Sequence, residues 1–95
     1  EFTAVFCFSD YVGFGAIRVL RRAGLRIPAD VAVMGYDDVA FAELTNPPLS
    51  TVRIAKTRLG ATAAEALLAR VEGAEAKDGE TLITLPPELV VREST

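Results

Sequence analysis

The sequence contains no histidine and a single cysteine, Cys7. Without histidine, these residues can form neither a histidine-based catalytic triad nor a histidine metal site, and no imidazole can act as a general base. One cysteine excludes an intrachain disulfide and a cysteine-rich zinc cluster. Because Cys7 lies in an apolar run, we interpret it as a small buried residue, since a reactive thiol needs a basic neighbour.

Excess positive charge and long apolar stretches are also lacking. The 95 residues include 10 basic and 13 acidic side chains, a net charge of −3, which gives no support for a nucleic-acid surface. No stretch approaches the roughly 20 apolar residues that a membrane span needs, so no membrane partner is expected. The hydrophobic share of 51% argues against disorder. The length fits one domain at most, or a piece of one.

Two nearly continuous apolar runs, Phe2–Phe8 and Val31–Tyr36, predict strands that are buried on both faces. Such strands are typical of a parallel sheet covered by helices. The residues between them place apolar side chains on one side of a helix and arginines on the other, and Gly24 is expected to end that helix. Strand, helix and strand in this order form a βαβ unit.

The second half of the chain continues the alternation of helices and strands. We predict a short helical segment over Val39–Leu44, a strand over Ser50–Ile54 and a helix over Lys56–Glu72 that Gly73 closes. A polar loop over Ala74–Glu80 follows, and then two strands, Thr81–Leu85 and Leu89–Arg92, which Pro86-Pro87 separates. The order indicates the α/β class. So small a sheet would leave exposed edges, so we expect this chain to be part of a larger protein.

Polar residues follow both apolar strands. Ser9 and Asp10 come after the first strand, and Asp37 and Asp38 come after the second. Ligands of open parallel sheets bind beyond the carboxyl ends of the strands, so Ser9, Asp10 and Asp37 would line one rim. Carboxylates there accept hydrogen bonds from hydroxyl or ring N–H groups, which suits a sugar or a nucleobase better than an anion.

Each of these residues also has a plain structural interpretation. Asp10 is most simply a helix N-cap, a task that Ser9 could share, and Asp38 could cap the short segment that follows it. Asp37 fits a ligand contact and a turn-stabilising role equally well. Aspartates at strand ends also loosely resemble an Mg²⁺ site for phosphoryl transfer, with Lys56 as a distant candidate for the lysine that such a site needs.

A series of motifs in order along the chain resembles the C-terminal part of LacI/GalR-family transcription regulators. The motifs are a strand that ends in a polar residue and Asp, A-x-x-x-L-x-x-x-G-L-x-x-P-x-D from Ala16, GYDD from Gly35, P-P-L-S-T-V from Pro47, R-L-G-x-x-A from Arg58, and P-x-x-L-V-x-R-x-S from Pro86. Together the motifs cover nearly the whole chain in order.

The resemblance implies a type I periplasmic-binding-protein-like fold, of which this chain is a part. In that family two Rossmann-like α/β lobes with parallel sheets close around a small-molecule effector, often a sugar or a purine. The proteins are cytoplasmic homodimers without catalysis or a cofactor. They bind operator DNA through a helix-turn-helix headpiece that is absent from these residues. The related periplasmic sugar-binding transport proteins share the fold, and a lobe of such a protein is the alternative.

The resemblance also implies a division of the chain between the lobes and roles for several residues. Residues 1–51 would lie in the C-terminal lobe, residues 52–86 in the N-terminal lobe, and residues 87–95 back in the C-terminal lobe. Family members commonly contact the effector at the positions of Ser9 and Asp37, and the rim argument adds Asp10 to the candidate effector-binding residues. Many relatives have asparagine where this chain has Ser9. The expected dimer-interface residues are Tyr11, Phe41 and Leu44.

Overall fold

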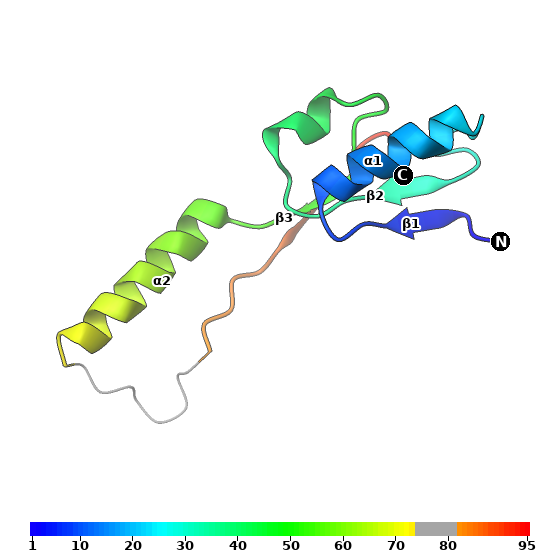
Figure 1. The fold of residues 1–95 in the computed structure, drawn as a ribbon. Coiled ribbons are helices and arrows are strands. Elements are labelled where there is room, and N and C mark those ends of the chain that lie inside the picture. The colour runs from blue at the N-terminus through cyan, green and yellow to red at the C-terminus, as the bar shows by residue number, and fades with distance from the viewer. Residues whose placement is uncertain (74–81) are drawn as a thin grey trace. The chain divides into compact units, whose positions relative to one another are not determined.

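The computed structural model of the chain describes residues 1–73 and 82–95 (Figure 1). Its elements in order are β1 (Ala4–Phe6), α1 (Asp10–Arg22), β2 (Ala32–Met34), the 3₁₀ helix η1 (Ala40–Leu44), β3 (Thr51–Arg53), α2 (Lys56–Val71) and β4 (Glu88–Val90). The chain divides into two compact units. The first unit comprises residues 1–53 and 88–95, and the second comprises residues 54–87.

The first unit contains the predicted βαβ arrangement. Strands β1 and β2 pair in parallel, with Val5 opposite Val33, and α1 connects them. The backbone N–H of Cys7 continues the ladder by donating to the carbonyl oxygen of Met34 at 2.7 Å. Strands β3 and β4 form a separate antiparallel pair, and an isolated bridge from Met34 to Ser50 links β2 to the segment before β3. The parallel pairing expected from the apolar runs is therefore confirmed.

Helix α1 packs one apolar face onto this sheet. Its buried residue Ile17 joins a core whose other buried members come from the residue after β1, from β2, from η1 and from the segment before β3, namely Cys7, Val33, Ala42 and Leu49. Burial raises the pKa of the Cys7 thiol, which favours its uncharged form. Gly24 has a φ of 80°, and the N–H groups of Gly24 and Leu25 bond back to Arg21 and Leu20, so the helix ends in the predicted left-handed turn.

The prediction that the first strand is buried on both faces is wrong for the described residues. Phe2, Phe6 and Phe8 are exposed, whereas Val5 and Cys7 on the other side pack against the core. Side chains alternate between the two faces of a strand, and α1 covers the face that carries Val5 and Cys7. Because apolar side chains occur on both faces of β1, its sequence is apolar throughout, although only one face is covered by α1.

Two predictions concern the segment before β4. Residues 82–85 of the expected strand Thr81–Leu85 are not in a strand, because no described segment pairs with them, and Thr81 itself lies outside the described residues. The predicted loop Ala74–Glu80 also lies outside them. Strand β4 begins at Glu88, directly after Pro86-Pro87, and extends to Val90 in place of the expected Leu89–Arg92.

The second unit is dominated by α2, whose bounds agree with the predicted helix to within one residue. No residue of α2 is buried, and its apolar side chains Leu59, Leu67, Leu68 and Val71 are exposed. Neither α1 nor α2 has the length and apolar character that crossing a bilayer requires, and no other helix in the described part of the chain does either.

Candidate functional site

The loops that follow β1 and β2 meet at the carboxyl edge of the parallel pair. The backbone N–H of Asp10 donates to the carbonyl oxygen of Tyr36 at 2.9 Å, so the start of α1 is joined to the residue before Asp37. Ser9 is the N-cap of α1, and its hydroxyl accepts a hydrogen bond from the N–H of Val12 at 3.4 Å. The interpretation of Asp10 as the cap is therefore wrong, and the cap is the alternative residue Ser9.

Asp10 is instead a buried connector. Its side chain is completely inaccessible to solvent, and its two carboxylate oxygens have different partners. Oδ1 accepts a hydrogen bond from the Thr51 hydroxyl at 2.5 Å, and Oδ2 accepts one from the N–H of Val39 at 2.8 Å. Charge-assisted bonds of this kind compensate for the burial of a carboxylate. In this structure Asp10 thus holds β3 and the loop before η1 against α1, and its side chain is not presented at the rim.

Asp37 stands at the end of the second strand with an unusual backbone. Its φ is 109° and that of Asp38 is 51°, a region that side-chain-bearing residues seldom adopt. Its N–H donates to the carbonyl oxygen of Val52 in β3 at 2.9 Å. The side chain of Asp37 is half-buried, as is that of Ser9. Non-glycine residues in such geometry cluster at binding sites, because the surrounding structure must hold them there.

Asp38 forms ion pairs and caps no helix. Its Oδ2 accepts from Nε of Arg53 at 2.7 Å and its Oδ1 accepts from Nη2 of Arg92 at 2.8 Å. Burial acts to raise the pKa of Asp38, but the bonds from Arg53 and Arg92 outweigh it and hold the pKa below its ordinary value. The N-cap of η1 is Val39, which makes no side-chain capping bond, so the expected cap at Asp38 is wrong.

The arginines and Thr51 are site residues that the sequence interpretation missed. Arg92 is the arginine of the closing P-x-x-L-V-x-R-x-S motif, and Thr51 belongs to the P-P-L-S-T-V motif. The two motifs therefore include Arg92 and Thr51 but do not indicate which side chains these residues contact. Arg53 follows directly after the second motif, and pairing it with Asp38 requires knowledge that β3 runs beside the GYDD loop.

The aspartates do not form the metal site of the phosphoryl-transfer alternative. Asp10 is bonded to a hydroxyl and an amide, whereas Asp38 is neutralised by two guanidinium groups. Across residues 1–73 and 82–95, no group of three or more acidic or cysteine side chains is placed to hold a metal ion. The edge suits a neutral, hydroxyl-rich or N–H-bearing molecule better than a cation.

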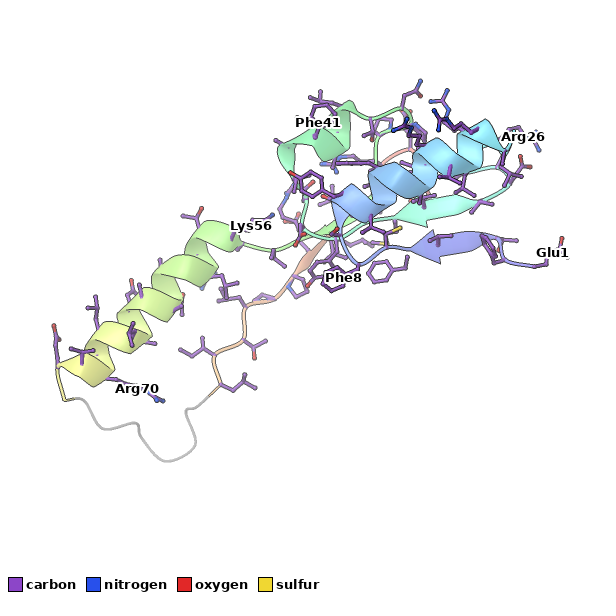
Figure 2. All side chains as sticks on the ribbon, viewed as in Figure 1. Glu1, Phe8, Arg26, Phe41, Lys56 and Arg70 are labelled. Atoms are coloured by element: carbon purple, nitrogen blue, oxygen red, sulfur yellow. The ribbon has the colours of Figure 1, made fainter. Side chains whose placement is uncertain are left out.

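A second cluster contains two of the expected interface residues, Tyr11 and Phe41. Tyr11 and Phe14 of α1 contact edge to face, with ring centroids 5.7 Å apart, and Phe14 meets Phe41 of η1 at 6.1 Å. Tyr11, Phe41 and Leu44 are all exposed, and Figure 2 labels Phe41 on η1. We call Tyr11, Phe14 and Phe41 the aromatic patch; Leu44 belongs to the same 3₁₀ helix as Phe41. Phe14, which the sequence interpretation did not single out, holds the patch together.

A hollow of about 570 Å³ lies elsewhere, at the C-terminal end of α1. Two of its three charged lining residues are already used within the chain: Arg21 donates to the carbonyl oxygen of Asn46, and Arg26 is paired with Asp30, whereas the third is Glu93. Size alone therefore does not make this hollow a better candidate than the strand edge, where backbone strain and polar side chains converge.

Comparison with known proteins finds relatives that match nearly the whole chain. Residues 2–95 match the family model for a periplasmic binding protein-like domain. The chain is 44% identical over 92 residues to the HTH-type transcriptional repressor PurR of Vibrio vulnificus and 46% identical over 92 residues to the ribose operon repressor of Haemophilus influenzae. These alignments cover 97% of the chain but only 27% of each relative, so the chain spans about a quarter of their length.

Solved structures agree with the sequence relatives. The transcriptional regulator CelR in complex with cellobiose matches 98% of the chain with a TM-score of 0.90 and 41% identity, and the match covers 28% of that protein. The lac repressor dimer bound to operator and the anti-inducer ONPF matches 98% of the chain with a TM-score of 0.87 and 35% identity, over 32% of that protein. The expected resemblance to LacI-family regulators and the expected α/β fold class are both confirmed.

Proposed function

Because the chain belongs to the periplasmic binding protein-like family and is similar throughout to LacI-family regulators, we propose that it is the effector-sensing and dimerising part of a LacI-type transcriptional regulator. The observation that carries this proposal is the strand edge where Ser9 and Asp37 follow neighbouring parallel strands, with Asp37 held in a rare backbone geometry. A small molecule bound there would shift the equilibrium between two arrangements of the regulator, because it binds one of them more tightly.

The effector is of the sugar or purine class. Asp37 would accept hydrogen bonds from its hydroxyl or ring N–H groups, and Ser9 could donate or accept one. The relatives support the sugar class, since one is named for the ribose operon and CelR is complexed with cellobiose. Asp10 stays in the proposed site as a supporting residue, because its buried carboxylate accepts a hydrogen bond from Val39 in the loop that carries Asp37, and its backbone N–H donates to Tyr36 in that loop.

The two lobes of the regulator would share the chain as the resemblance implies, with residues 1–51 and 87–95 in the C-terminal lobe and residues 52–86 in the N-terminal lobe. The division into compact units supports this proposal, since its boundaries fall after Arg53 and after Pro87. The unit boundaries differ from the proposed lobe boundaries by one or two residues, because the first unit includes the whole of β3 together with its partner strand β4.

The aromatic patch would form part of a homodimer interface. Exposed aromatic side chains that contact one another are typical of surfaces that a partner covers. Operator DNA would be bound by a headpiece outside these residues, and the protein would act in the cytoplasm, where the operator is. Since the named relatives are transcriptional repressors, we propose no catalytic role.

A lobe of a sugar-transport protein is the less favoured alternative, because the named relatives are regulators. The opening codons of the gene separate the two proposals: a secretory leader would indicate transport, and a helix-turn-helix would indicate regulation.

A thermal-shift screen of the full-length gene product tests the proposal. The panel contains ribose, lactose, cellobiose, adenine and guanine, with MgCl₂ as a control for the metal alternative. We expect at least one sugar or purine to raise the Tm in a concentration-dependent manner, because a ligand that binds only the folded state stabilises it. A shift with MgCl₂ alone, or no shift with any sugar or purine, would contradict the proposal.

A further inference from the structure

Asp38 has a role of its own beside the candidate effector contact. Resting on the proposed function, we propose that Asp38 is a positioning residue: its ion pairs with Arg53 and Arg92 hold Asp37 in its binding geometry. They also tie the loop that carries Asp37 and Asp38, which we call the effector loop, to β3 and to the segment that follows β4.

The contacts of Asp38 are those of a clamp. Its side chain is only 10% exposed, and each carboxylate oxygen is bonded to a different guanidinium group. Arg92 is 16% exposed and is fixed by a second bond from its Nη1 to the carbonyl oxygen of Leu49 at 2.9 Å. Arg53, at 47% exposed, also reaches Glu88 at 3.4 Å. Two cations around one buried carboxylate leave it little freedom to move.

The geometry of Asp37 requires such a clamp. Asp37 and Asp38 have consecutive positive φ angles, which neither residue prefers. On one side, the backbone N–H of Asp37 is bonded to Val52 in β3. On the other side, the backbone N–H of Asp38 contacts the Thr51 hydroxyl at 3.4 Å while its side chain is gripped by the arginines. Loss of the clamp would let the loop relax to ordinary angles and turn the Asp37 side chain away.

The partners of Asp38 lie in the first unit, near the points where the chain leaves it for the second unit and returns. Arg53 is the last residue before the chain enters the second unit, and β4, which Arg92 follows closely, is where the chain re-enters the first unit. Arg53 pairs in register with Glu88 across the β3–β4 ladder. A single carboxylate therefore joins the effector loop to the chain near both points. A rearrangement of the chain there on ligand binding would act directly on Asp37 through this cluster.

The experiment measures ligand affinity by titration calorimetry in the full-length gene product, with the compound from ribose, lactose, cellobiose, adenine and guanine that gives the largest thermal shift. We expect Asp38→Asn to weaken binding at least tenfold. Asp30→Asn is the matched control, since it also removes an aspartate–arginine pair but one on the turn after α1, and it should change affinity less than twofold.

A double-mutant cycle separates positioning from general loss of structure. If Asp38 acts through Asp37, Asp38→Asn causes no further loss in the Asp37→Ala background. An unchanged affinity in Asp38→Asn, or an equal loss in both backgrounds, would overturn the inference while leaving the proposed function intact. Failure of Asp37→Ala itself to weaken binding would instead refute the proposed function. Should Asp38→Asn not fold, Arg53→Gln removes one of the two ion pairs at a half-exposed position and is tested by the same cycle.

Discussion

At the scale of single residues, the buried side chain of Asp10 limits the size of the residue that can occupy position 35. Gly35, the first residue of the GYDD motif, lies against it: a Cβ at this position would clash with Asp10 Oδ1 and approach Leu49 Cδ2 to 2.9 Å. The position has no positive φ, so the requirement for glycine comes from lack of space alone. The motif therefore starts with glycine because the start of α1 packs directly onto the second strand.

Gly35→Ala tests this packing. We expect it to lower the free energy of unfolding of the full-length gene product by about 1–3 kcal/mol or more, because the extra methyl group displaces both Asp10 and Leu49. Denaturant unfolding monitored by circular dichroism measures the change.

Gly60→Ala is the matched control, since a Cβ there meets nothing within 4 Å. In the interior of α2 this substitution should be neutral or stabilise by up to about 1 kcal/mol. Equal unfolding free energies for the two variants would contradict the assigned contact between Gly35 and Asp10.

Some residues of the candidate site could be predicted from the sequence, and others could not. Ser9, Asp10 and Asp37 could be selected because the strand pattern places them at one edge, and this reasoning uses only local periodicity. It could not distinguish a rim residue from a buried one, so Asp10 was placed with the ligand contacts. Arg92 lies 54 residues from its partner Asp38, and no local signal connects them. Such a pair becomes visible only when the path of the chain is known.

At the scale of elements, helices were predicted better than strands for a physical reason. The apolar period of α1 and α2 and the glycines that follow them are local properties of the sequence. Helix α1 ends at Arg22, just before the expected stop at Gly24, and α2 agrees with its expected range to within one residue. A strand exists only where another strand pairs with it. Residues 82–85 have the composition of a strand, yet no described segment lies beside them, whereas residues 88–90 pair with β3.

The turn between α1 and β2 contains a pH-sensitive pair. Hydrogen bonds from the side chain and the backbone N–H of Arg26 lower the pKa of Asp30 to about 2. In an unfolded chain the pKa of aspartate is about 3.9. The native state therefore favours the ionised form, so Asp30 stabilises the fold above about pH 4, and this stabilisation disappears as the pH falls toward 2.

Asp30→Asn should accordingly reduce the dependence of unfolding free energy on pH between about 4 and 2, and high salt should weaken the effect because the pair is exposed. Urea unfolding across this pH range measures it. Glu65→Gln, an exposed substitution on α2, is the control. A pH profile in Asp30→Asn that coincides with that of the parent protein would contradict the assigned ion pair.

At the scale of the whole molecule, the candidate site is assembled from segments that are distant in the sequence. Asp10 lies at the start of α1, and Asp37 and Asp38 follow β2. In the sequence, Arg53 precedes the second unit and Arg92 follows it. Asp10, GYDD, P-P-L-S-T-V and P-x-x-L-V-x-R-x-S all supply residues to this site, so these motifs mark places where separate segments converge. The carboxyl edge of a parallel sheet is where such folds bind ligands.

The most direct test of the account is the affinity of the full-length gene product and its Asp37→Ala variant for the compound selected in the thermal-shift panel, measured by titration calorimetry. Loss of the carboxylate leaves a polar group of the ligand unmatched. We therefore predict that the variant binds more weakly by about 1–3 kcal/mol, which corresponds to roughly 5- to 150-fold. Equal affinities for the two proteins, with the variant fully folded, would contradict the assignment of this strand edge as the effector site.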